Sequence, residues 1–167
     1  RRQRQMCIRD SVTTMHTGLP VGQHGVFEWQ FYEPQIDTLI APLLFSFAGD
    51  HDRETLQALH VDPQALFPAQ TIYRQLQQHG VESFVFQPLA FAHSSYSRTM
   101  QQGATIMPYG TLPEALVNVG SLLLDRTTSP QYIYLYFNAI DATCHTYGPE
   151  SAQLHACLLY TSPSPRD

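Results

Sequence analysis

The chain has 167 residues, of which 43% are hydrophobic, and a formal net charge of −5 at pH 7. It contains no lysine, whereas a protein that binds nucleic-acid phosphates needs a basic stripe, so we expect no nucleic-acid binding by a basic surface. No apolar run reaches the roughly 18 residues that a membrane-spanning helix requires, so no membrane span is expected either.

The two ends of the chain, RRQRQMCIRD and CLLYTSPSPRD, are unusual for protein. When they are back-translated, residues 6–10 and 158–161 share one DNA word in opposite orientations, which is typical of translated sequencing adapters. We therefore expect residues 1–11 and 157–167 to be adapter-derived and residues 12–156 to be a fragment of one native domain. The alternative is a basic N-terminal arm with a Ser/Pro tail. Without the ends only Cys144 remains, which excludes a disulfide framework.

The first native segment has the pattern of a helix that ends at a glycine. Residues 12–18 read as its last turns, with Gly18 as the left-handed cap and Pro20 just beyond. A glycine-punctuated loop follows at 17–25. Alternating aromatic and polar residues over 26–32 predict a strand, and a second strand within 36–44 is close enough to pair with it antiparallel. Residues 45–50 are expected to form a loop, and 52–60 a weak helix.

From residue 69 onward helical and strand patterns alternate. A helix is predicted over 71–79, with Ile72, Tyr73 and Leu76 on its buried side, and a strand over 81–86. Residues 91–107 show no regular pattern and are expected to be irregular.

A capping box starts the next predicted helix. Thr111 and Glu114 have the spacing with which a hydroxyl and a carboxylate satisfy each other's free backbone N–H groups. The helix is expected to run to about Arg126. The residues expected to face the sheet are Leu116, Val119, Leu123 and Leu124.

The stretch from 131 to 138 predicts a buried strand, because it is dense in aromatic and β-branched residues. Its members of these types are Tyr132, Ile133, Tyr134, Tyr136 and Phe137. Helices that alternate with strands favour a parallel sheet with right-handed crossovers. The expected fold class is therefore α/β, with a mostly parallel sheet flanked by helices and a short antiparallel strand pair near the N-terminus.

Two potential metal ligands follow this strand, Asp141 and His145, four residues apart. Ligands in open α/β sheets bind beyond the carboxyl ends of strands, and a carboxylate and an imidazole are both good zinc ligands. The plainer interpretation is an N-capping aspartate followed by a surface histidine, since D-x-x-x-H alone is a weak signal. Cys144, between them, is expected to be a small buried apolar residue rather than a ligand.

Other candidates are weaker. His24 could be a ligand or general base, but a histidine in such a loop more often bonds the backbone of its own loop. His93 beside Ser94 and Ser95 suggests a nucleophile, but adjacent residues cannot form a Ser–His pair with in-line geometry. The glycine-rich loop matches neither common nucleotide-binding fingerprint. The remaining histidines are expected at the surface: His16, His51, His60, His79 and His155.

Two motifs together resemble a known family. VTTMHTGLPVGQHG at 12–25 is followed more than a hundred residues later by NAIDATCHTYGP at 138–149. With the intervening FEWQFYEPQID, PQALFPAQTIYRQL and AHSSYS segments, they are similar to the type I phosphodiesterase/nucleotide pyrophosphatase family of the alkaline phosphatase superfamily, most of all to its bacterial members. The resemblance implies that 12–156 is a fragment of one alkaline-phosphatase-like domain, a partial core with a mostly parallel sheet.

The resemblance also implies a chemistry. Family members hydrolyse small phosphoester substrates by two-metal phosphoryl transfer, with two divalent ions of the zinc type and a threonine nucleophile. Asp141 and His145 match the aspartate and histidine of one metal site. The threonine's position falls at Ile8, in the expected adapter segment, and the remaining metal ligands fall outside the native segment. No catalytic residue is therefore assigned, and this chain alone is expected to be inactive.

One departure from the family pattern leaves alternatives open. A phosphate-contacting asparagine of the nucleotide pyrophosphatases falls near Trp29, so that specificity is in doubt. The alternatives are a non-catalytic metal-binding superfamily member, or a phosphomonoesterase, sulfatase or phosphonate hydrolase of the same superfamily. The pattern leaves substrate identity, oligomeric state and compartment (cytoplasmic, periplasmic or secreted) open.

Overall fold

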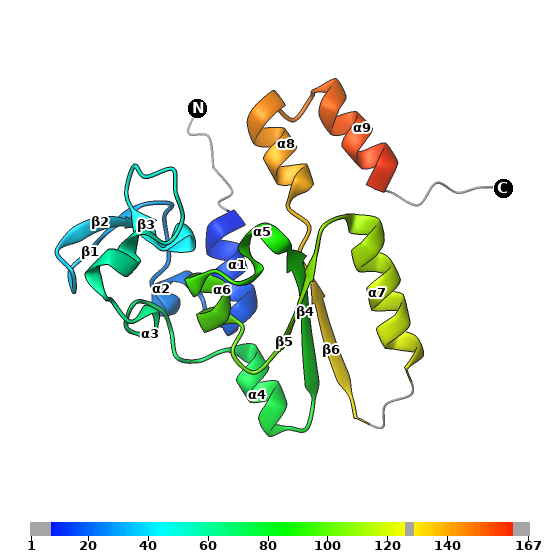
Figure 1. Ribbon diagram of the computed structural model, residues 1–167, viewed down its shortest axis with the longest axis horizontal. Helices are drawn as coiled ribbons and strands as arrows, with labels where there is room; N and C mark the ends of the chain where they lie inside the picture. Colours follow the sequence, from blue (N-terminus) through cyan, green and yellow to red (C-terminus); the bar gives the residue numbers. More distant parts are fainter. Residues whose placement is uncertain (1–7, 126–128, 162–167) are drawn as a thin grey trace.

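A computed structural model describes residues 8–125 and 129–161 of the chain (Figure 1). The outer parts of the expected adapter segments, residues 1–7 and 162–167, lie outside the described residues, as does Arg126, the expected end of a helix. The fold is α/β, as predicted, with one parallel and one antiparallel sheet of three strands each. Helix α1 lies between the two sheets (Figure 1).

The N-terminal helix ends as its glycine predicts. Helix α1 spans Ile8–Thr17, and Gly18 adopts a φ of 69° while its N–H donates to the carbonyl of Thr14 at 2.8 Å. A left-handed residue at this position satisfies a free carbonyl of the last turn, which glycine does without a Cβ penalty. The short helix α2, Val21–His24, follows directly.

The predicted antiparallel pair is confirmed, but it is shorter than expected and has a third strand. Strand β1 covers only the end of the segment predicted at 26–32, because its partner β2 offers just four residues for pairing. The segment 45–50, expected as a loop, contains β3, whose two residues pair with the far side of β2. The bounds are Phe31–Glu33 for β1, Thr38–Ala41 for β2 and Ser46–Phe47 for β3.

Four short helical segments lie within and after this sheet: η1 links β2 to β3, and η2, α3 and α4 lead on toward the parallel sheet. The weak helix expected over 52–60 is a 3-10 helix, η2, and the capping hydroxyl of Thr71 begins α4 by accepting the N–H of Arg74 at 3.2 Å. The bounds are Pro42–Leu44 for η1, Thr55–Leu59 for η2, Pro63–Leu66 for α3 and Ile72–Gln78 for α4.

The parallel sheet has the strand order β5-β4-β6, with β4 in the centre. Residues 91–107, expected to be irregular, instead contain part of α5, all of α6 and the start of β5. Their helices are too short to show a clear period, and Ser94 starts α6 by accepting the N–H of Ser97 at 3.1 Å. The bounds are Glu82–Pro88 for β4, Leu89–Ala92 for α5, Ser95–Met100 for α6, Thr105–Tyr109 for β5 and Gln131–Leu135 for β6.

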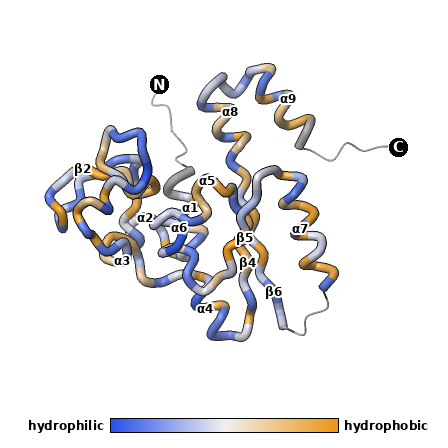
Figure 2. The backbone as a smooth tube through the Cα atoms, in the orientation of Figure 1, coloured by the Kyte–Doolittle hydropathy of each residue, from blue (hydrophilic) through white to orange (hydrophobic). Residues whose placement is uncertain are grey.

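Helix α7, Leu112–Leu124, begins with the predicted capping box of Thr111 and Glu114, but it packs on a different face from the one expected. Leu116, Leu123 and Leu124 are exposed; of the four residues predicted to face the sheet, only Val119 does. The contacts with the sheet come from Ala115, Val119 and Leu122. Hydrophobic residues recur both along the sheet and along this helix (Figure 2). Because the helix has apolar residues on more than one side, its sequence does not show which side is buried.

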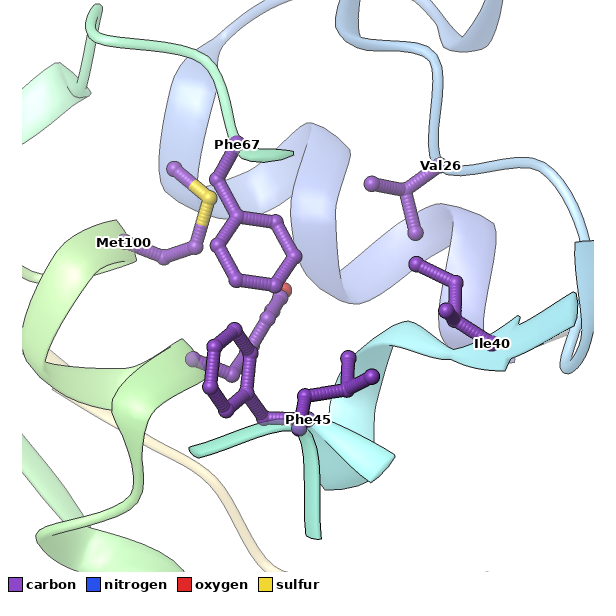
Figure 3. Packing of buried hydrophobic residues seen from close by; sticks show 7 residues of the cluster. Val26, Ile40, Phe45, Phe67 and Met100 are labelled. Carbon is purple, nitrogen blue, oxygen red and sulfur yellow. The ribbon is translucent and has the colours of Figure 1, made fainter. Parts of the chain in front are cut away.

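The larger hydrophobic core lies between α1, the antiparallel sheet and α6. Val26, Ile40, Phe45, Phe67 and Met100 point toward one another there (Figure 3), and each is at most 5% exposed. A second core lies on the α7 face of the parallel sheet, around Phe86, Tyr109 and Ala115. Burial of this apolar area from water is the main contribution that holds the two sheets and their helices together.

Strand β6 separates these two regions by alternating its side chains. Ile133 and Leu135 join the α7 core, while Tyr132 and Tyr134 contact rings on α4 and α1. Within residues 8–125 and 129–161, no helix is both long and apolar enough to cross a bilayer.

Candidate functional site

The predicted ligand pair lies on one face of a helix that begins just beyond the parallel sheet. Helix α8, Ala139–Tyr147, follows its N-cap residue Asn138, which lies three residues after the end of β6, and carries Asp141 in its first turn and His145 in its last. Residues four apart are neighbours on a helix surface. Asp141 Oδ1 therefore lies 3.4 Å from His145 Nε2, with side-chain exposures of 34% and 68% respectively.

The chain between β6 and α8 is fixed to the carboxyl edge of the sheet. The N–H of Tyr136 donates to the carbonyl of Phe86 at 2.9 Å, which extends the pairing with β4 by one residue. The hydroxyl of Tyr109, the last residue of β5, donates to the carbonyl of Tyr136 at 2.6 Å. All three parallel strands thus help to place α8 where ligands bind in open α/β sheets.

Asp141 and His145 line a cavity of about 350 Å³. Besides α8, its walls come from α1, from residues 28–29, from the loop around 43–53 and from residues 87–97. Four aromatic side chains contribute to these walls, together with the charged groups of Glu28 and Arg53. The aromatic lining residues are Trp29, Phe91, Tyr96 and Tyr136. A few polar groups converging in a largely apolar concavity are typical of small-molecule sites.

At the end of β4, beside the cavity, two buried glutamine side chains are hydrogen-bonded to each other. Gln87 and Gln101 exchange two side-chain amide bonds of 2.9 Å each, and Gln87 also donates to the carbonyl of Ala92 at 3.3 Å. Both glutamines are buried. Because buried amides are costly when unpaired, this exchange stabilises the junction of β4, α5 and α6 beneath the site.

The donor chemistry of the pair fits a divalent metal in part. A carboxylate and an imidazole 3.4 Å apart on one helix can both reach one cation, and zinc takes ligands of these types. In the described part of the chain, no group of three or more His, Cys, Asp or Glu side chains converges. Cys144, expected to be buried, is only half-buried and lies outside any such group. The described residues thus supply two donors, fewer than a complete zinc site needs.

The other candidates of the loop and serine motifs have structural roles. His24 Nδ1 accepts the N–H of Val26 at 3.1 Å, the local backbone bond favoured from sequence, and its Nε2 lies 3.0 Å from the hydroxyl of Thr14. Ser94 caps α6, and Ser95 binds the carboxylate of Glu54. The exposed positions expected for the remaining histidines are confirmed for His51, His60, His79 and His155.

The prediction that His16 is a surface residue is wrong. It is 2% exposed, its Nδ1 lies 2.7 Å from the hydroxyl of Tyr73, and the rings of Tyr96 and Tyr134 contact it from α6 and β6. Burial lowers the pKa of His16 to about 4. Its flanking threonines and methionine hid this in the sequence, because a single polar residue in a short helical segment carries no clear periodicity.

Sequence reasoning also missed the far wall of the cavity. Arg53, Glu28 and Trp29 lie in segments that read as strand, loop or weak helix, with no motif to mark them. The position of Arg53 depends on contacts between separate parts of the chain, such as its hydrogen bond to the carbonyl of Leu43 at 3.3 Å and that of the Ser95 N–H to the carboxylate of Glu54 at 2.8 Å.

A parallel sheet with helices on both faces, and an acid–histidine pair at its carboxyl edge, defines an α/β protein with a site at the strand ends. The sequence matches the family described as type I phosphodiesterase / nucleotide pyrophosphatase over residues 11–160. The chain belongs to that family. No curated protein sequence matches it.

Two solved structures share the fold. Both are murine ectonucleotide pyrophosphatase / phosphodiesterase 5, one of them an inactive variant in complex with AMP. The inactive variant has a TM-score of 0.56 and 14% identity, over 88% of this chain and 36% of that one. The other has a TM-score of 0.54 and 14% identity, over 91% of this chain and 40% of that one. The chain thus spans less than half the length of these structures.

Proposed function

We propose that this chain is part of a metal-dependent phosphoric ester hydrolase, in which Asp141 and His145 hold one of two divalent ions. The observation that carries the proposal is the 3.4 Å approach of the carboxylate and imidazole on the cavity wall, at the carboxyl edge of the sheet. Family membership over residues 11–160 supports the reaction class. A bound divalent ion would supply Lewis-acid stabilisation of charge on a phosphoryl oxygen.

The chain's own residues contribute position and environment. Helix α8 holds the pair in one rotational register, because residues four apart share a face. Asp141 in its first turn and His145 in its last suit the helix dipole, which favours negative charge at the start and a cation at the end. The aromatic walls lower the local dielectric, and charge interactions in the cavity are therefore stronger than in bulk water.

Metal binding by the pair is tested on the chain itself. Isothermal titration with Zn²⁺ is expected to show one site, weakened at least tenfold by Asp141→Asn or His145→Ala, because each change removes one of two donors. His79→Ala is the matched control, since His79 is an exposed histidine beyond the end of α4. If His79→Ala lowers the zinc affinity as much as His145→Ala does, the assignment is wrong.

Catalysis is tested in a parent protein that carries the native sequence in place of the expected adapter segments, with the threonine that the family resemblance places at the position of Ile8. There, either substitution is expected to reduce hydrolysis of bis(p-nitrophenyl) phosphate by several orders of magnitude, on the order expected when one ion of a two-metal site is lost. Retained turnover at saturating zinc would refute the role of the pair. Turnover of p-nitrophenyl phosphate but not of the diester would assign the site to a phosphomonoesterase instead.

A further inference from the structure

The cavity that contains the acid–histidine pair also has a cation on its wall. Among the described residues that line it, Arg53 is the single arginine, and the chain contains no lysine. The described lining also includes the carboxylates of Glu28 and Asp141. The cavity is therefore polarised by one fixed guanidinium, which stays charged at any physiological pH.

Arg53 sits on a loop whose backbone is fixed from two sides. The N–H of Glu54 donates to the carbonyl of Leu44 at 2.9 Å, and the carboxylate of Glu54 accepts the N–H of Ser95 at 2.8 Å as well as the Ser95 hydroxyl. The hydroxyl of Ser46 donates to the carbonyl of Asp52 at 2.7 Å. These bonds join the loop to η1, β3 and α6, so Arg53 starts from a pre-organised position.

The guanidinium of Arg53 is fixed by two contacts, and further N–H donors remain available to bind a ligand. It stacks over the ring of Phe91, with 5.5 Å from its central carbon to the ring centroid, and one N–H donates to the carbonyl of Leu43 at 3.3 Å. Within the described part of the chain no carboxylate forms an ion pair with it; the neighbouring carboxylate of Glu54 binds Ser95 and the amide of Gln57. A guanidinium has five N–H donors, of which the protein uses one here.

A run of contacts joins Arg53 to the ligand pair along one wall. The ring of Phe91 meets the ring of Tyr136 edge-on, with 6.0 Å between the centroids, and Tyr136 lies three residues before Ala139, the first residue of α8. Tyr136 and Asp141 line the same cavity, and burial and, secondly, the negative charge of Asp141 raise the pKa of Tyr136. The cavity is thus lined both by the proposed metal-ligand pair and by a stacked guanidinium.

We propose that Arg53 is a specificity-determining residue that binds a second anionic group of the substrate, a phosphate or carboxylate outside the reacting phosphoryl group. The inference rests on the proposed function, which puts the reacting phosphoryl group at Asp141 and His145. A planar guanidinium binds either oxyanion through two parallel bonds, and the aromatic platform beneath it limits its motion. The favoured substrates are phosphoesters that carry a second negative charge outside the reacting phosphoryl group.

Two ligands that differ by one carboxylate test the proposal on the purified chain. Phenyl phosphate and 4-carboxyphenyl phosphate are titrated in the presence of Zn²⁺, and binding is followed through the fluorescence of Trp29, the single tryptophan, which lines the cavity. The carboxylated ligand is expected to bind about tenfold more tightly. Arg53→Gln is expected to abolish this difference, and Arg53→Lys to retain part of it. Arg74→Gln, which changes a surface arginine bonded to Gln102 and Ala69, is expected to preserve it.

Several outcomes would overturn the proposal. Equal affinity of the wild-type chain for both ligands, or no binding of either, would remove the anionic subsite. Equal weakening of both ligands by Arg53→Gln would show that the side chain only supports the fold of its loop. Inorganic phosphate that binds with the same dependence on Arg53 would indicate a free-phosphate site instead. Failure of the proposed function would give a different result: Asp141→Asn would leave the zinc affinity unchanged, while the difference in affinity between the two ligands would persist.

Discussion

The buried His16 makes the stability of the chain depend on pH in a predictable direction. Its ring is enclosed by Tyr73, Tyr96 and Tyr134, and burial lowers its pKa to about 4, against 6.5 for an exposed histidine. As the pH falls below about 6.5, the unfolded chain takes up the proton while the folded chain does not. The contribution of His16 to the free energy of unfolding is therefore intact above about pH 6.5 and is lost progressively down to about pH 4.

The magnitude follows from the two pKa values. At pH 5 the unfolded imidazole is almost fully protonated and the folded one is mostly neutral, a difference of about 2 kcal/mol; below pH 4 it approaches about 3 kcal/mol. Such a loss is a sizeable fraction of the roughly 5–15 kcal/mol by which domains are stable.

Urea unfolding at pH 8 and pH 5 measures this effect. His16→Gln keeps a polar partner for the hydroxyl of Tyr73 and cannot titrate, so its stability should fall between the two pH values by about 2 kcal/mol less than that of the wild type. His79→Gln, at an exposed histidine, should follow the wild type. If His16→Gln loses as much stability as the wild type between pH 8 and pH 5, the reasoning fails.

Three further substitutions test the backbone and a helix cap, all by urea or thermal unfolding. Gly103→Ala is expected to lower the free energy of unfolding by about 3 kcal/mol or more, because Gly103 has a φ of 97° and an added Cβ would lie 2.7 Å from the backbone nitrogen of Arg74. Gly120→Ala, in open space on α7, should instead stabilise the chain by about 0.5–1 kcal/mol. A loss of stability in Gly120→Ala would contradict this reasoning. Thr111→Ala removes one half of the capping box of α7 and is expected to cost about 1 kcal/mol, so an unchanged midpoint would show that the cap contributes nothing.

The sequence predicted the elements of the parallel sheet better than the way they pack. The strands β4 and β6 each have a local signal in a dense run of apolar residues. The cap of α7 has one in the spacing of its hydroxyl and carboxylate. The buried face of α7 has no such signal, because leucines occur on both sides of the helix. The structure selects the face with Ala115, whose small side chain lets the helix approach the ring of Tyr109.

The residues of the candidate site also differ in how far the sequence could predict them. Asp141 and His145 could be predicted because their spacing alone brings them together once the segment is helical. Arg53 could not, because its place depends on Glu54 reaching Ser95 across 41 residues and on Phe91 packing against Tyr136.

This division has a physical consequence for the site. The helix that carries the acid–histidine pair is fixed by the strand ends, through the bonds of Tyr109 and Tyr136, and not by the loop of Arg53. A change at Arg53 should therefore alter which ligand binds while Asp141 and His145 keep their spacing, because no hydrogen bond among residues 8–125 and 129–161 links that loop to α8. The proposed selectivity and the proposed metal binding are thus separable in this fold: the zinc titration tests the second, and the difference in affinity between the two phenyl phosphates tests the first.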